Sequence, residues 1–261
     1  MAKLPPAFLT ALGRKRPPDT FEIGGSSYVL TRVFKNDFFA ITSLYEGELG
    51  KVVLKINRQA SLAGIPLRWI GRFLAAREQT LHERLAGIEG VPRFLGRWGI
   101  TGVVHEYVEG HVLGRNERVP DDFHPRLRRI IEQMHRRGVA YVDLQKCENV
   151  IVGDDGQPCL IDFQISWYLP RRWGGELWPV RLIRSRLQAG DLYHLVKFQR
   201  RTRPDQLTAQ EFAASYRRPW YVRLHTSFTR PFILARRAIL NRLDPKRGCG
   251  ERGRVDPDTK R

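Results

Sequence analysis

The sequence is poor in cysteine and lacks long apolar runs, and each shortage excludes a class of protein. Its three cysteines, Cys147, Cys159 and Cys249, are widely spaced without a Cys-x-x-Cys pair, which argues against a disulfide framework or a zinc site. No stretch approaches the roughly 18 apolar residues of a membrane span. The first basic cluster follows a short apolar patch, the wrong order for a signal peptide. We therefore expect a cytoplasmic protein.

Histidine clusters, internal repeats and low-complexity tracts are also absent. The seven histidines show no His-x-x-x-His spacing, so packing or solvated positions are expected for them rather than metal binding. Hydrophobic residues make up 42% of the chain and aromatic residues 10%, values typical of a folded protein. A chain of 261 residues can bury one large core or the cores of two small lobes.

Acidic residues are scarce mainly in the last third of the chain. Residues 171–261 hold 22 basic and 8 acidic residues and so carry +14 of the net charge of +18. This asymmetry indicates either an anionic partner, such as an acidic membrane surface, or arginine-rich solvated faces without one. A basic amphipathic helix predicted at 230–243 suits a membrane, although such helices more often pack onto their own protein. Nucleic acid is the weaker alternative partner.

The predicted elements divide the chain into four segments and indicate an α+β fold. Residues 1–20 read as a basic extended arm. Residues 21–108 hold five strand-like segments and one long helix that begins at Pro66. Residues 109–245 are mainly helical with one strand hairpin, and 246–261 form a charged, flexible tail.

A lysine and a glutamate occupy unusual places in the first half. Lys55 interrupts the apolar strand VVLKI, and alternation puts it on the same face as Val53. Glu78 falls on a helical row whose apolar members are Ile70, Leu74, Leu81 and Leu85. Its carboxylate should therefore point toward the strands and meet the lysine. Alone, Lys55 would be an ordinary edge-strand lysine; paired with Glu78, it predicts a site that positions a phosphate.

Residues 141–164, YVDLQKCENVIVGDDGQPCLIDFQ, hold two acids beside apolar, strand-like sequence. Asp143 follows a short apolar segment, Asn149 directly precedes the strand VIV, and Asp162 ends the run PCLI. Asn149 and Asp162 offer the oxygen ligands that suit Mg²⁺, which completes its shell with phosphate and water. Asp143 is then free to accept a hydroxyl proton. Each acid taken alone is more typical of a turn or a cap.

In this order, the residues resemble the protein kinase superfamily over about residues 28–200. Lys55 resembles the strand-three lysine of that family, and Glu78 resembles its partner on helix C. His105–Gly110 is similar to the hinge between the lobes. The resemblance implies that the adenine of ATP binds there, against Glu106, Tyr107 and Val108.

The second half continues the resemblance. Tyr141–Asp143 is similar to the His-Arg-Asp catalytic loop, and Asp162–Gln164 to the Asp-Phe-Gly magnesium motif. Asp191 resembles the buried aspartate of helix F that anchors the catalytic loop. The resemblance implies a bilobal fold, with a five-stranded antiparallel sheet and helix C in the N-lobe and a shortened, mainly helical C-lobe.

Three departures from the family pattern stand out. The first hairpin, VFKNDFF, has no glycine to cradle phosphates, and Lys35 or Asn36 would have to contact them instead. Five residues rather than four precede Asn149 in the catalytic loop, and Glu148 stands at the usual spacing. Gln164 replaces the last glycine of the magnesium motif, which stiffens the backbone there.

The expected function is transfer of the γ-phosphate of Mg-ATP to a hydroxyl group, with Asp143, Lys55 and Glu78 as catalytic residues. The short C-lobe is similar to bacterial proteins related to lipopolysaccharide core sugar kinases, and to small atypical serine/threonine kinases. The acceptor would be a protein or an anionic glycolipid, with contact to the inner membrane face through residues 171–261. Residues 165–190 show no periodicity that would identify the acceptor. The alternative is a pseudokinase that binds nucleotide or acts as a scaffold.

Overall fold

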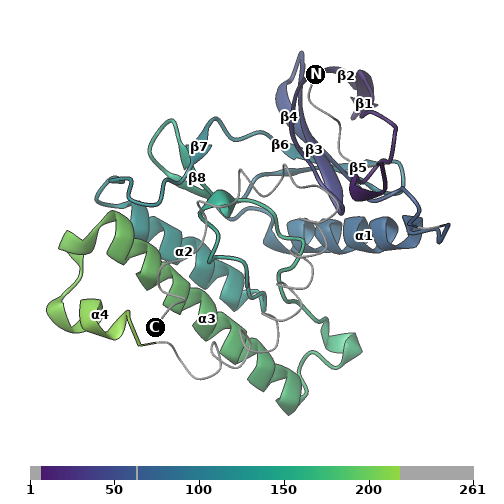
Figure 1. The fold of residues 1–261 in the computed structure, drawn as a ribbon. Coiled ribbons are helices and arrows are strands. Elements are labelled where there is room, and N and C mark those ends of the chain that lie inside the picture. The colour runs from purple at the N-terminus through teal and green to yellow at the C-terminus, as the bar shows by residue number, and fades with distance from the viewer. Residues whose placement is uncertain (1–6, 63, 218–261) are drawn as a thin grey trace.

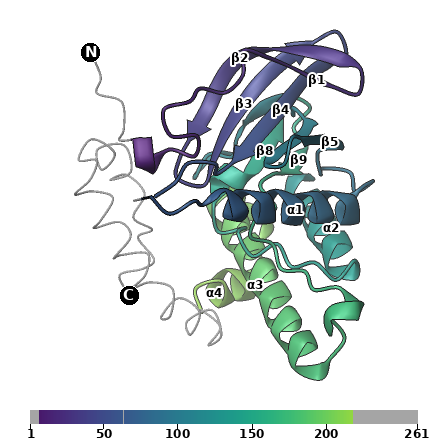
Figure 2. The same cartoon turned by 90° about the vertical axis from the view of Figure 1, so that its right-hand side faces the viewer.

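The computed structural model of the chain describes residues 7–62 and 64–217. The first half is an antiparallel sheet with one long helix beneath it (Figures 1 and 2). Its elements are the 3-10 turn η1 (Ala7–Leu9), β1 (Thr20–Ile23), β2 (Ser26–Asn36), β3 (Ala40–Gly47), β4 (Gly50–Asn57), α1 (Arg68–Leu85), β5 (Phe94–Trp98) and β6 (Gly102–Glu106).

The second half is mainly helical and carries a small sheet of order β7-β8-β9 on its upper side (Figure 1). Helices α2 and α3 pack against each other beneath this sheet. The elements are β7 (Gly110–Val112), α2 (Phe123–Arg136), η2 (Cys147–Asn149), β8 (Val150–Gly153), β9 (Pro158–Leu160), η3 (Arg171–Trp173), α3 (Trp178–Thr202), η4 (Pro204–Gln206) and α4 (Ala209–Ala214).

The large sheet has six strands in the order β1-β2-β3-β4-β6-β5, one more than the five predicted. The additional strand is β1, which pairs with β2 through a tight hairpin. Gly24 and Gly25 form this turn with φ values of 59° and 80°, conformations that glycine adopts without steric cost. A strand of four residues is too short to display the alternation on which the prediction relied.

Within the described part of the N-terminal segment, residues 7–20 do not form the extended arm that the sequence predicted for 1–20. Residues Ala7–Leu9 form a 3-10 turn, and Leu12 is buried in the core above the sheet. Arg58, whose side chain is fully buried, holds this segment by donating to the carbonyl oxygen of Phe8 at 3.1 Å, and it also donates to that of Phe38 in the β2–β3 hairpin at 2.8 Å. A buried guanidinium requires such acceptors, and the segment and the hairpin each supply one of these two.

Helix α1 packs against the sheet, and the residues that it buries differ in part from the apolar row that the sequence predicted. Leu81 and Leu85 are buried as expected, but Ile70 is only half-buried. The first turn makes its contact through Gly71, where a Cβ atom would come within 2.0 Å of the Arg58 carbonyl oxygen. The absence of a side chain therefore lets the helix touch the end of β4 directly.

Helix α3 begins at Trp178, inside the stretch that showed no periodicity. The cause is exposure, because the residues from 178 to 186 are exposed or half-buried around the whole helix. Only the later turns, from Asp191 onward, contribute buried side chains to the core. The predicted amphipathic helix at 230–243 and the tail at 246–261 lie outside the described residues. Among the residues described, no helix combines the length and apolarity that crossing a membrane requires.

Two glycines in helices provide a matched test of this packing. Glycine in a helix normally costs about 0.5–1 kcal/mol relative to alanine. A Cβ atom added at Gly190 in α3 would meet no other atom within 4 Å, so we expect Gly190→Ala to stabilise the protein by about that amount. Gly71→Ala should instead destabilise it by about 1–3 kcal/mol, because the contact with Arg58 must open. Urea unfolding of both variants tests the pair, and equal effects would contradict the close contact at Gly71.

Candidate active site

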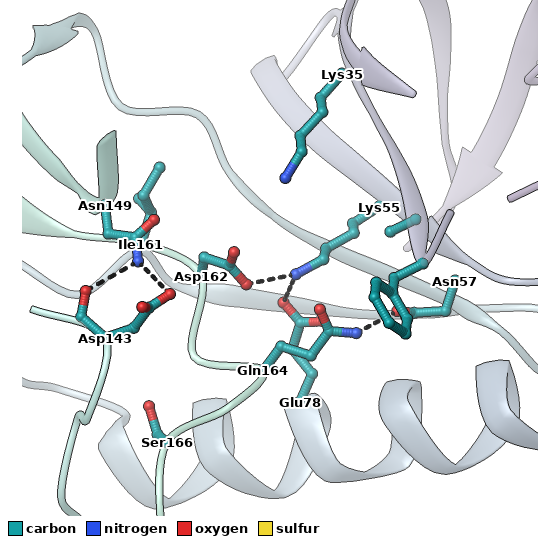
Figure 3. Close-up of polar contacts among 12 residues, drawn as sticks. Lys35, Lys55, Asn57, Glu78, Asp143, Asn149, Ile161, Asp162, Gln164 and Ser166 are labelled. Atoms are coloured by element: carbon teal, nitrogen blue, oxygen red, sulfur yellow. Dashed lines mark hydrogen bonds and ion pairs between the residues drawn. The ribbon is translucent and has the colours of Figure 1, made fainter. Parts of the chain in front are cut away.

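The ammonium group of Lys55 on β4 lies between two carboxylates. Its Nζ atom is 3.0 Å from Oε1 of Glu78 on α1 and 2.8 Å from Oδ1 of Asp162, which follows β9 (Figure 3). Lys55 and Glu78 are buried, whereas the Asp162 side chain is 36% exposed. The structure thus brings together three of the predicted site residues from three different elements.

The charges of this group depend on one another. Burial by itself would lower the pKa of Lys55, but the carboxylates of Asp162 and Glu78 outweigh it and raise that pKa. Lys55 in turn is the main cause that lowers the pKa of Asp162 to about 2. Burial raises the pKa of Glu78, whose Oε2 has no hydrogen-bond partner among the described residues. Lys55 and Asp162 therefore remain ionised at neutral pH.

Asp143 and Asn149 form a second polar group beside the first (Figure 3). The Asn149 amide nitrogen donates to Oδ2 of Asp143 at 2.9 Å, and Lys146 donates to the same oxygen at 2.6 Å. The additional residue of this loop is accommodated by η2, a 3-10 turn that buries Asn149 and leaves Glu148 exposed. Burial raises the pKa of Asp143, with Lys146 acting in the opposite direction.

A carboxylate from α3 shapes the backbone in front of Asp143. The buried Asp191 accepts hydrogen bonds from the backbone N–H of Tyr141 at 2.8 Å and of Val142 at 2.7 Å, and from His135 at 2.9 Å. Val142 has a φ of 69°, a conformation that a β-branched residue adopts only under strain. The bond from Asp191 holds this strained residue in place, which is the anchoring position expected of the helix F aspartate.

The segment after Asp162 is tied to the sheet and to α1. In this segment Asp162 has a positive φ, 60°, whereas Gln164 does not. The position of Gln164 therefore does not need a glycine. The side chain of Gln164 instead donates to Oδ1 of Asn57 at 2.9 Å (Figure 3). Arg77 on α1 donates to the carbonyl oxygens of Gln164 and Ser166. These bonds keep Asp162 next to Lys55.

A column of aromatic rings connects the sheet with the catalytic loop. The ring of His82 lies 5.7 Å from that of Phe94 and 5.2 Å from that of Phe163, which lies 5.7 Å from Tyr141. His105 stacks on His82 at 5.5 Å. Burial lowers the pKa of His82 to about 3 and that of His105 to about 4, so both rings are neutral at pH 7.

The predicted hinge leaves main-chain groups available. The backbone N–H of Glu106 donates to Arg93 and that of Tyr107 to Lys51, and the Glu106 carboxylate pairs with Arg93. The N–H and C=O of Val108 have no hydrogen-bond partner within the described part of the chain. A free donor and a free acceptor on one residue can bind the polar edge of a base.

The residues present suit a magnesium ion better than a fully protein-bound metal. No group of three or more histidine, cysteine, aspartate or glutamate side chains capable of holding a metal occurs in residues 7–62 and 64–217. Because the Asn149 nitrogen is directed at Asp143, its amide oxygen faces the other way and is free to coordinate. Asp162 uses only Oδ1 on Lys55. Two oxygen ligands match Mg²⁺, which fills its other positions with phosphate and water.

Sequence reasoning missed several polar residues of the site. Lys146 escaped notice because its contact with Asp143 depends on how the extended loop turns. Gln164 was noted only as a replaced glycine, and Asn57 and Arg77 gave no signal at all, since their partners lie about a hundred residues away in the chain. His82 could have been found, because it lies one helical turn after Glu78 on the buried face of α1.

The neutral, buried His82 makes stability depend on pH. Its pKa of about 3 in the folded protein, against 6.5 normally, means that the folded state binds fewer protons between these values. The contribution of neutral His82 to the free energy of unfolding is therefore fully present above about pH 6.5, and it decreases as the pH falls below that value. We expect His82→Phe, which preserves the ring column, to remove on the order of 2 kcal/mol of the loss between pH 7 and pH 5. Urea unfolding at both pH values measures this, and an unchanged loss would contradict it.

Comparison with known proteins supports the architecture. No protein-family profile matches the chain, and no curated protein matches its sequence. A solved structure of the Rio2 kinase-ADP/Mg²⁺-phosphoaspartate complex from Chaetomium thermophilum has a TM-score of 0.51 and 16% sequence identity, over 73% of this chain and 58% of the Rio2 chain. Another structure of Rio2 kinase from the same organism has a TM-score of 0.49 and 16% identity, over 69% and 60% of the two chains.

This chain therefore spans less than two thirds of the Rio2 kinase chains that it matches. At 16% identity, the likeness concerns the fold and not the residues of the site. It confirms the kinase-like architecture predicted from the order of the motifs, while the lipopolysaccharide sugar kinase subtype remains a prediction. The chain has a protein kinase-like α+β fold.

Proposed function

We propose that the protein is a kinase that transfers the γ-phosphate of Mg-ATP to a hydroxyl group. One observation carries the proposal: Lys55, held by Glu78, contacts Asp162 at 2.8 Å, beside the hydrogen-bonded pair of Asp143 and Asn149. Side chains that suit phosphate binding, metal binding and proton acceptance thus lie beside one another. The likeness to a Rio2 kinase structure with ADP and Mg²⁺ supports a nucleotide as the ligand.

Lys55 and the hinge would bind the nucleotide. The ammonium group, already oriented by Glu78, would contact the phosphate chain, and the free main-chain groups of Val108 would bind adenine beside Glu106 and Tyr107. Asp162 and Asn149 would hold Mg²⁺, which neutralises charge on the phosphate oxygens when it is bound.

Asp143 would act on the acceptor. Its carboxylate is held by Lys146 and Asn149, and burial raises its pKa, so that it is a stronger base than an exposed aspartate. The acceptor oxygen forms the new bond to phosphorus while the bond from phosphorus to the ADP oxygen breaks. The hydroxyl proton passes to Asp143.

A surface at the start of α3 supports a membrane-bound, anionic acceptor. Five large apolar side chains there are 46–76% exposed: Trp173, Leu177, Trp178, Leu182 and Ile183. Arg172 and Arg181 are exposed among them. Tryptophan and leucine beside arginine suit the interface of an acidic bilayer. We propose that this surface brings the protein to such a membrane, where an anionic glycolipid sugar would be the acceptor; a protein serine or threonine is the other candidate.

A pseudokinase is the second candidate function. The observation that favours it is the glycine-free hairpin between β2 and β3, whose turn amides are already hydrogen-bonded to Asp37. Such a protein would bind nucleotide without turning it over.

Replacement of the two acids distinguishes a kinase from a pseudokinase. We expect Asp143→Asn to lower the rate of phosphate transfer by about 10²-fold or more, because the proton acceptor is lost. Asp162→Asn should abolish Mg²⁺-dependent ATP binding and turnover. The assay is transfer of label from ATP to fractionated lysate, resolved into protein, glycolipid and small molecules. ATP binding without any transfer by the unmodified protein would establish the pseudokinase instead.

Removal of one exposed tryptophan tests membrane contact. We expect the protein to cosediment with vesicles rich in phosphatidylglycerol and only weakly with phosphatidylcholine, with loss of binding at high salt. Trp178→Ser should weaken vesicle binding by about 1–2 kcal/mol, since an exposed anchor is lost. Trp69→Ser is the matched control, because Trp69 is 65% exposed but belongs to α1 and not to the residues of this surface. Equal vesicle binding by both variants would contradict the proposed contact.

A further inference from the structure

Two backbone amides of the hairpin between β2 and β3 are not available to a phosphate. The carboxylate oxygen Oδ1 of Asp37 accepts hydrogen bonds from the N–H groups of Phe39 at 2.8 Å and Ala40 at 3.0 Å. The two amides are therefore occupied, and the group that occupies them is negatively charged. An anion beneath this hairpin would therefore bind mainly through a side chain.

The strand register brings Lys35 onto the face of the sheet that carries Lys55. Lys35 lies opposite Thr42 on β3, and Thr42 lies opposite Lys55 on β4. Residues paired across adjacent strands share a face, so these three side chains form one transverse row. Two strand spacings put the Cα atoms of the two lysines about 10 Å apart.

A β-bulge is responsible for this placement. The pairing shifts between Val33 and Lys35, so that Val33 lies opposite Ser43 and Lys35 opposite the next residue, Thr42. Without the additional residue, Phe34 would face Thr42 and Lys35 would point to the other side of the sheet. Figure 3 shows the result, with Lys35 reaching down toward the pair of Lys55 and Asp162.

Lys35 is held there by a contact that an anion can replace. Its Nζ atom lies 2.9 Å from Oδ2 of Asp37, and its side chain is 62% exposed. The Asp37 side chain is only 12% exposed, but the ammonium group of Lys35 lies toward solvent and can exchange this carboxylate for another anion. The charge of Lys35 already acts on Asp162, together with the charges of Lys55 and Lys146.

We propose that Lys35 binds the phosphate chain of the nucleotide opposite Lys55, as a side-chain replacement for a backbone phosphate cradle. The inference rests on the proposed kinase function, because it assumes that a nucleotide occupies the site. Lys55 is fixed by two carboxylates, whereas Lys35 moves from Asp37 to the phosphate when the nucleotide binds. Asp37 therefore competes with the phosphates for the same ammonium group.

Affinities for Mg-ATP and for adenosine, measured by calorimetry, test the proposal. Lys35→Gln should weaken Mg-ATP binding about tenfold or more and leave adenosine binding unchanged, because only the phosphates lose a charged partner. Lys35→Arg should retain most of the Mg-ATP affinity. Lys15→Gln is the matched control, since Lys15 is exposed in the N-terminal segment and the charge change is the same.

A variant that is expected to raise the Mg-ATP affinity separates phosphate binding by Lys35 from a purely structural role. Asp37→Asn keeps an oxygen to accept the turn amides but no longer attracts Lys35, so it should bind Mg-ATP about two- to fivefold more tightly. Wild-type-like Mg-ATP affinity in Lys35→Gln, or weaker affinity in Asp37→Asn, would overturn the assignment of Lys35 alone. A complete lack of Mg-ATP binding by the unmodified protein would overturn the proposed function and this inference together.

Discussion

The site is organised around one buried ammonium group. Lys55 of the sheet, Glu78 of α1 and Asp162 of the second half meet in ion pairs of 3.0 and 2.8 Å, and each charge is acceptable in this environment only while the others are present. The halves of the molecule are thus joined by the same group to which we assign phosphate binding. Removal of the buried Glu78 carboxylate would disturb the fold and the chemistry together.

In the second half of the chain a buried carboxylate also organises the site, but its partners are backbone amides. Asp191 stands 49 residues after Val142, yet its two oxygens bind the amides that set the course of the chain into Asp143. The strained φ of Val142 is therefore imposed by the tertiary structure and not by the local sequence. The position of the proposed base depends on helix α3 as much as on its own loop.

Residues whose environment follows from local periodicity could be predicted. Strand alternation and the helical row placed Lys55 and Glu78 correctly opposite each other, and both are buried. Patterns were uninformative where an element was too short, as in β1, or exposed on every side, as in the first turns of α3. They also gave no sign of Gln164 bonding to Asn57 or of the bulge that re-aims Lys35, because each depends on the pairing of distant segments.

Gly71 and Gln164 have a consequence for how such a protein could be controlled. Helix α1 rests on the main chain of Arg58 without an intervening side chain, and the segment after Phe163 is bonded to both the sheet and the helix. A displacement of helix α1, or a rotation of Phe163 out of the core, would break several of these contacts at once. Any change of state that needs either movement would therefore cost the free energy of several contacts together.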